Sequence, residues 1–317
     1  MENQINMNTE KTSTLIAIDI AKETLQVRTA RGSFSLENAA CGFKSLLKEI
    51  AGKPNVLVVF EATGGYERAL AEFLHAHGIP LSILNPRLLR AFAKSEGIKA
   101  KTDPIDAEMI YRFASQKTLR PTHPPTTQER ALGDLLDRRS QLTEFLAREK
   151  NRMQKASNKA VISSLRRGIK TLEKEIALIE KQIRHLVEQT AELNKPCALI
   201  TSVKGVGEVT AWTILAQLGE ISRVSRNQLV ALAGVAPFND DSGKHAGKRY
   251  IHGGRAKVRR ILYMAAHSAA QFNPVIKPYV ERLIARGKPY KCAITAAMRK
   301  LLIHIQALLK NSQFHPC

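Results

Sequence analysis

The segment KTDPIDAEMI, residues 101–110, places Asp103 and Asp106 at the start of a predicted helix. Asp103 precedes Pro104, and an aspartate followed by a proline is typical of a helix N-cap and first helical position. The two carboxylates would then lie about one turn apart on the same side of the helix. This pair could cap the helix or supply two ligands to a divalent cation, and the segment alone leaves both possibilities open.

Two further acids stand at the ends of apolar segments that we predict to be strands. TLIAID, residues 14–19, ends at Asp19, and VLVVFE, residues 56–61, ends at Glu61. Open α/β sheets place their chemistry at the carboxyl ends of strands. Four clustered carboxylates would repel one another unless cations neutralised them, and oxygen ligands suit Mg²⁺ or Mn²⁺. Each acid alone could be a strand terminus, a cap or a solvated residue, so their joint placement is what predicts a metal site for phosphoryl transfer.

The composition favours a polyanionic partner. The 317-residue chain has 49 Lys+Arg against 28 Asp+Glu, a formal net charge of +21. Such an excess points first to nucleic acid and second to an anionic membrane surface. The sequence shows neither an uninterrupted apolar run of spanning length nor a signal-peptide pattern, so we expect a cytoplasmic protein without a membrane partner.

The first region, residues 14–125, alternates strand-like and helix-like segments. Strands are predicted at 14–19, 25–27, 33–36, 56–61 and 80–85, with helices at 42–50 and 66–77. This alternation indicates an α/β layer structure around a central sheet. The prolines of THPPTT, residues 122–127, interrupt the pattern and mark a domain boundary.

The second region, residues 126–195, is helical and highly charged. Its apolar residues recur at alternating steps of four and three, which predicts a coiled coil: Leu165, Ile169, Leu172, Ile176, Ile179, Ile183 and Leu186. The partner helix could belong to a second subunit, which would make the protein a dimer or tetramer, or it could be residues 132–153 of the same chain. In the second case Ser163 and Ser164 mark the predicted turn.

The third region, residues 196–310, is predicted to be helical and strongly basic. Two helical stretches flank Gly205 and Gly207, a pattern typical of a helix-hairpin-helix, whose backbone amides can bind a phosphate. Between Ser242 and Lys310 there are 15 Lys and Arg residues and one acid, Glu281. We expect nucleic-acid phosphates to contact the central basic run: Lys248, Arg249, Arg255, Lys257, Arg259 and Arg260.

Four segments of this chain together resemble the DEDD transposases of the insertion-sequence 110 family. They are IAIDIAKETLQV, VVFEATGGYE, NPRLLRAFAKSEGIKAKTDPIDAEMI and LAGVAPFNDDSGKHAGKRYIHGGRAKVRRILYMAA. The resemblance implies a RuvC-like domain of RNase H type whose Asp, Glu, Asp, Asp metal site matches Asp19, Glu61, Asp103 and Asp106. It also implies a C-terminal serine that attacks DNA, at Ser242 in NDDSGKHAG. The residues around Ser242 reveal no dedicated base, so that assignment rests on the resemblance.

The function implied by the resemblance is transposition of an insertion sequence by metal-assisted DNA cleavage and strand exchange. Ser242 would form a transient phosphoserine linkage, and a structured bridge RNA would pair with donor and target DNA. One alternative is a RuvC-like metal-dependent junction nuclease, which needs the four acids but not Ser242. The other is a non-enzymatic architectural DNA-binding protein, which needs only the basic region and the coiled coil.

Overall fold

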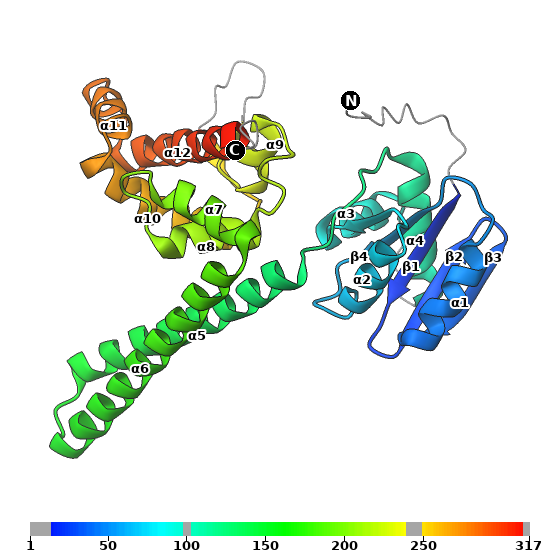
Figure 1. Ribbon diagram of the computed structural model, residues 1–317, viewed down its shortest axis with the longest axis horizontal. Helices are drawn as coiled ribbons and strands as arrows, with labels where there is room; N and C mark the ends of the chain where they lie inside the picture. The colour runs from blue at the N-terminus through cyan, green and yellow to red at the C-terminus, as the bar shows by residue number, and fades with distance from the viewer. Residues whose placement is uncertain (1–13, 98–102, 239–248, 313–317) are drawn as a thin grey trace. The chain divides into compact units, whose positions relative to one another are not determined.

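The computed structural model describes residues 14–97, 103–238 and 249–312. The chain divides into two compact units, Met1–Pro124 and Pro125–Cys317, which we call unit 1 and unit 2. Figure 1 shows a sheet with flanking helices in unit 1 and helices almost throughout unit 2. The expected combination of an α/β part with a helical part is therefore confirmed.

Unit 1 is built on a five-stranded mixed sheet with the order β3-β2-β1-β4-β5. The strands are β1 (Leu15–Ile20), β2 (Thr24–Thr29), β3 (Gly32–Glu37), β4 (Leu57–Glu61) and β5 (Leu81–Leu84). β1, β2 and β3 pair antiparallel, whereas β1, β4 and β5 pair parallel. The predicted strands all exist, with bounds shifted by one or two residues. β1, β4 and β5 are the mostly apolar runs expected of strands buried on both faces, whereas β2 and β3 alternate more buried with more exposed residues.

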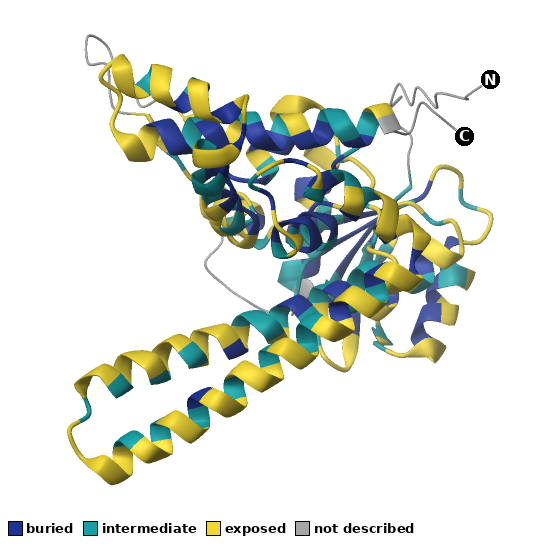
Figure 2. Ribbon diagram, turned by 60° about the vertical axis from the view of Figure 1, so that its left-hand side comes forward, coloured by how far each residue is buried: buried dark blue, intermediate teal, exposed yellow. Residues whose placement is uncertain are grey.

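Helices cover both faces of this sheet. α1 (Ala40–Ile50) and α2 (Arg68–Ala76) share a buried core with Ile16, Ile18 and Phe60. On the opposite face, α3 (Pro86–Ser95) and α4 (Asp103–Gln116) pack against Ala17 and Val59. Successive strand residues point to opposite faces, so one strand contributes to both cores. Figure 2 shows the buried strands between layers of partly exposed helices.

The second region folds as a helical hairpin within unit 2. α5 (Thr127–Lys155) and α6 (Lys159–Gln189) lie antiparallel and pack against each other, and the heptad residues of α6 are all buried or half-buried. The hairpin therefore accounts for the seam without a second subunit. The turn predicted at Ser163 and Ser164 is wrong, because both residues lie inside α6. Asn158 caps α6 instead, accepting hydrogen bonds from the amides of the first helical turn, so the chain reverses at residues 156–158.

The rest of unit 2 is a helical core. It comprises α7 (Ala191–Thr201), α8 (Glu208–Gln217), α9 (Arg226–Leu232), α10 (Ala256–Phe272), α11 (Ile276–Ala285) and α12 (Tyr290–Ser312), with a short ribbon of β6 (Pro237–Phe238) and β7 (Tyr250–Ile251). Trp212 of α8, 1% exposed, lies in this core. Within the described residues, only α12 is long and apolar enough to cross a membrane. Its buried residues Ala293, Leu301 and Ile305 account for that apolar character as part of the core.

Candidate active site

The sheet register brings Asp19 and Glu61 to adjacent positions. β1 and β4 run parallel, and their pairing proceeds from Leu15 with Leu57 to Ile18 with Phe60. The next residues along the two strands are Asp19 and Glu61. Asp19 shares the face of Ala17, and Glu61 shares that of Val59, which is the face covered by α4. The two acids therefore stand side by side at the carboxyl ends of neighbouring strands, on one face.

α4 turns Asp106 towards the same face. Ala107, Ile110, Phe113 and Ala114 are the buried side of this helix. Asp106 precedes Ile110 by four residues, which places it on the buried side one turn nearer the helix N-terminus. Asp19, Glu61 and Asp106 are all half-buried. We call these three residues and their side of the sheet the acidic face.

The structure describes less of Asp103, the fourth predicted metal ligand. The backbone of α4 begins at Asp103, but its side chain lies outside the described part of the structure. Among the side chains that are described, no group of three or more His, Cys, Asp or Glu is close enough to hold a metal ion. Asp19, Glu61 and Asp106 each already have interactions within the protein. The backbone thus gathers these residues on one face without drawing their side chains into a metal cluster.

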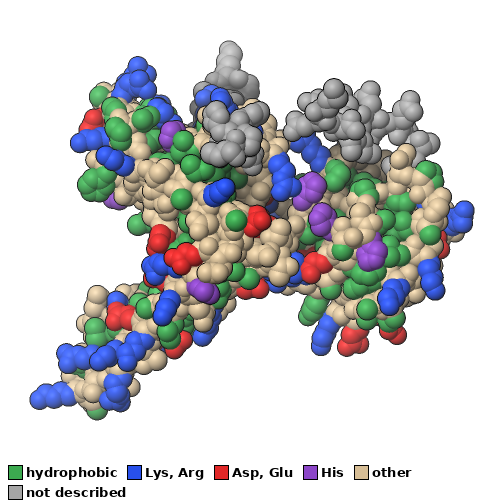
Figure 3. Space-filling model, in the orientation of Figure 1, with side chains coloured by type: hydrophobic (Ala, Val, Ile, Leu, Met, Phe, Trp, Pro, Cys, Tyr) green, Lys and Arg blue, Asp and Glu red, His purple; other side chains and the backbone are tan. Residues whose placement is uncertain are grey.

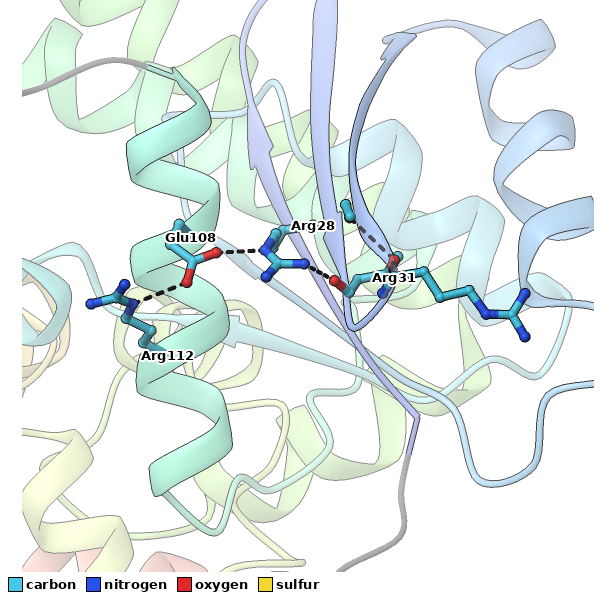
Figure 4. Close-up of polar contacts among 6 residues, drawn as sticks. Arg28, Arg31, Glu108 and Arg112 are labelled. Atoms are coloured by element: carbon cyan, nitrogen blue, oxygen red, sulfur yellow. Dashed lines mark hydrogen bonds and ion pairs between the residues drawn. The ribbon is translucent and has the colours of Figure 1, made fainter.

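Glu108 fastens α4 to the sheet. Figure 4 shows its carboxylate between two guanidinium groups: Arg28 Nε lies 2.5 Å from Oε2, and Arg112 Nε lies 3.0 Å from Oε1. Arg28 belongs to β2 and pairs with Ala17, so it projects towards α4. The hydrogen bond from Arg28 is the main reason why the pKa of Glu108 lies below its usual value. This contact adds to the buried residues of α4 in setting the rotation of the helix and the side on which Asp106 lies.

The Glu67 side chain stabilises the loop that follows Glu61. Its Oε2 accepts hydrogen bonds from the amides of Thr63 and Gly65, at 3.1 and 2.9 Å, and from the Thr63 hydroxyl at 3.0 Å. Burial raises the pKa of Glu67, but these hydrogen bonds together outweigh it and leave the pKa below its usual value. From the sequence, Glu67 and Glu108 are ordinary acids near the predicted site. Their role depends on partners that only the fold brings within reach.

Ser242 and Lys248 lie outside the described residues, in the segment 239–248. The ribbon strands β6 and β7 flank this segment and pair with each other. On the ribbon, the exposed Phe238 ring stacks on His252, with centroids 4.0 Å apart and planes inclined by 24°. The described residues therefore fix both ends of the chain segment that carries Ser242.

The two glycines of the predicted helix-hairpin-helix occupy different environments. Gly205 has a positive φ of 93°, and a Cβ there would lie 2.6 Å from the Ala269 backbone of α10. Its lack of a side chain is therefore required for packing. Gly207 is exposed, caps α8 with an extended backbone, and has open space around its Cα. Of the two, Gly207 is the one whose surroundings leave room for a ligand.

Much of the predicted basic run also contacts acids and carbonyls within unit 2. Arg255 pairs with Glu220 at 2.6 Å, and Lys257 pairs with Asp137 of α5 at 2.5 Å. Arg260 lies 3.6 Å from Glu144, also on α5. Arg259 donates a hydrogen bond to the Gly253 carbonyl, and Arg249 is exposed. Such exposed ion pairs contribute about 0–1 kcal/mol each, so a phosphate could compete for these cations.

Comparison with known proteins gives a consistent identification over most of the chain. Residues 16–162 match the DEDD transposase profile of the IS110 family, and residues 197–281 match the profile described as "Transposase IS116/IS110/IS902 family". The chain is 30% identical over 313 residues to the pilin gene-inverting proteins of Moraxella bovis and Moraxella lacunata, which covers 95% of this chain and 97% of each relative. It is 26% identical over 302 residues to the transposase for insertion sequence element IS1111A of Coxiella burnetii, which covers 82% of this chain and 79% of that protein. This chain is therefore a DNA transposase or recombinase, and it belongs to the IS110 family.

Proposed function

We propose that this protein recombines DNA by a serine-dependent phosphoryl transfer assisted by divalent metal at the acidic face. The observation that carries the proposal is the shared placement of Asp19, Glu61 and Asp106 on one face of the sheet, at strand ends and at the start of a helix. Phosphoryl transfer depends strongly on charges positioned around the reacting phosphate.

The topology of unit 1 supports a RuvC-like domain of RNase H type. Three antiparallel strands continue into two parallel strands, so β1 lies at the centre of the order β3-β2-β1-β4-β5. This arrangement puts the first acid on the central strand and the second on its parallel neighbour. The third acid then comes from a helix that packs over both strands.

The acidic face suits Mg²⁺ or Mn²⁺ by its donor chemistry, because the candidate ligands are all carboxylates. Asp19, Glu61, Asp103 and Asp106 would hold the ion. When bound, a divalent cation supplies charge that stabilises a phosphodiester under attack. The protein's own part is to hold these acids at a fixed spacing, through strand register and through the Arg28 and Glu108 contact.

In the proposed covalent step, the Ser242 hydroxyl oxygen attacks the phosphorus of a DNA phosphodiester. An Oγ–P bond forms and the bond from phosphorus to the leaving sugar oxygen breaks. The serine gives up its proton, and the leaving oxygen acquires one. A sugar hydroxyl of the new partner strand then attacks the same phosphorus and releases the serine, so the number of phosphodiester bonds is conserved.

The proposed substrates are the two ends of a mobile DNA element and a target, with a structured bridge RNA as the guide. Two relatives named for pilin gene inversion match over nearly their full length, which supports rearrangement of DNA segments as the reaction class. The exposed Gly207 and the basic run around α10 are the proposed phosphate contacts of unit 2, with the turn at 202–207 serving as a helix-hairpin-helix. Strand exchange between two DNA ends also favours a homo-oligomer.

A covalent trapping assay tests this function. Ser242→Ala should abolish both strand exchange and the protein-linked DNA seen on a denaturing gel, while DNA binding persists. Ser222→Ala is the matched control, because Ser222 lies in the connection between α8 and α9 of the same unit, outside both the turn at 202–207 and the basic run. Metal-dependent cleavage that survives Ser242→Ala would favour a junction nuclease. DNA binding without any cleavage by the unmodified protein would favour an architectural role.

A further inference from the structure

The two ends of the α5–α6 hairpin differ sharply in charge. The hairpin tip, residues 148–174, contains nine basic residues and only two acids, Glu149 and Glu173. The basic residues are Arg148, Lys150, Arg152, Lys155, Lys159, Arg166, Arg167, Lys170 and Lys174. The hairpin base, residues 127–147 and 175–189, contains five basic residues and seven acids. Figure 3 shows the gathering of Lys and Arg side chains around the tip.

This contrast distinguishes the tip from an ordinary solvated helix face. Both halves belong to the same two helices, and all nine basic residues of the tip are exposed. A solvated helix surface usually intersperses charges of both signs, as the hairpin base does. In the tip, mutual repulsion among cations opposes folding with little local compensation, because its two acids can neutralise few of the nine cations: Glu173 pairs with Lys150, and Glu149 pairs with Arg152.

We propose that the hairpin tip binds the phosphate backbone of duplex DNA. The tip contains no Phe, Tyr or Trp, whereas sites for single strands generally add aromatic rings on which bases stack. Long, exposed Lys and Arg side chains on a helical scaffold suit contacts to phosphates that carry no sequence information. DNA is the expected partner because this family acts on DNA, and the proposal does not depend on Ser242 or on a metal.

The length of the hairpin places the proposed DNA contact of the tip away from the core of unit 2. α5 alone has 29 residues, which corresponds to a length of about 43 Å at 1.5 Å per residue. The tip lies at the end of the hairpin away from the core of unit 2, as Figures 1 and 2 show. The tip would therefore hold DNA outside the segment bound by the helical core, and it would extend the footprint on the duplex.

The test compares two double variants with the same loss of charge. Arg166→Gln with Arg167→Gln neutralises part of the tip, and Arg138→Gln with Lys181→Gln neutralises two exposed cations of the hairpin base. Glutamine has a helix propensity close to that of Arg and Lys, so circular dichroism should show unchanged helicity for both proteins. Affinity of each full-length protein for a duplex oligonucleotide is then measured between low and physiological salt.

The tip variant should lower affinity about tenfold and reduce the slope of log K against log salt by about 1 to 2, because each phosphate contact contributes about 0.9. The base variant should leave both quantities close to those of the unmodified protein. Hydroxyl-radical footprinting should show lost protection at the edge of the footprint with the centre retained. Equal slopes for both variants, or a loss confined to an RNA duplex of the same length, would overturn the proposal.

This test is independent of the proposed function, because duplex binding is measured without strand exchange. Failure of the Ser242 adduct to form would count against the proposed function and not against DNA binding by the tip.

Discussion

The acidic face of unit 1 and the basic run of unit 2 place their charges by different physical means. Asp19 and Glu61 are positioned by strand register, and Asp106 by the buried side of a helix, so the backbone determines where they lie. Arg255, Lys257 and Arg260 instead extend from one end of α10 and contact acids on other segments. Charges set by the backbone tolerate little displacement, whereas long exposed side chains can exchange a carboxylate for a phosphate at small cost.

Among the substitutions that test this comparison, removing one carboxylate from the acidic face should have the largest effect. Asp106→Asn keeps the side-chain shape but removes the charge that a metal ligand needs, so we expect a loss of strand exchange of about a thousandfold or more. Far-UV circular dichroism should show an unchanged fold. Glu96→Gln, an exposed acid at the end of α3, is the control and should retain activity. Normal activity of Asp106→Asn would show that the acidic face has no part in strand exchange.

Gly205 should prove essential to unit 2 through packing. Gly205→Ala adds a methyl group that meets the Ala269 backbone at a positive φ, and we expect a loss of about 3 kcal/mol in the free energy of unfolding. Gly207→Ala, in open space at a helix N-cap, should cost less than about 1 kcal/mol. Trp212 is the only tryptophan of the chain and lies in the unit 2 core, so its fluorescence can follow urea unfolding. Equal losses of unfolding free energy in the two variants would contradict the packing role assigned to Gly205.

A smaller effect is expected at Glu67, which fastens the loop after Glu61. Its pKa is lower in the folded protein, so its ionised form stabilises the loop at neutral pH, and this contribution is lost as the pH falls through the folded pKa. Glu67→Gln should weaken the loop by about 1 kcal/mol at pH 7 and by less in acid. Hydrogen–deuterium exchange of a peptide covering residues 62–67 measures this directly.

The exchange comparison at Glu67 has a clear control. Glu23→Gln changes an exposed acid of the same unit and should leave exchange in the 62–67 peptide unaltered at both pH values. If the 62–67 peptide exchanged equally slowly in Glu67→Gln and in the unmodified protein at pH 7, the hydrogen bonds from Thr63 and Gly65 to Glu67 would not be responsible for holding this loop in place.

The sequence was sufficient for the strands and for the combination of an α/β part with a helical part, because both follow from local apolar periodicity. It was less reliable for connections. The turn of the α5–α6 hairpin lies at residues 156–158, not at Ser163 and Ser164, because the Asn158 cap stabilises a helix start there and serine is tolerated inside the exposed part of α6. Ser157 and Asn158 are polar and exposed, as are Ser163 and Ser164, so composition alone could not separate the two positions.

The amino-acid sequence by itself determined which residues could do chemistry: carboxylates after apolar strands, an aspartate pair at a helix start, and an excess of Lys and Arg. Only the tertiary structure decided which face Asp19, Glu61 and Asp106 share, because that depends on pairing between strands distant in the chain. It also decided that Gly205 serves packing and that Glu67 and Glu108 hold neighbouring segments in place. Local patterns specify residue type and element, whereas the partners of a side chain are set by long-range contacts that no local pattern contains.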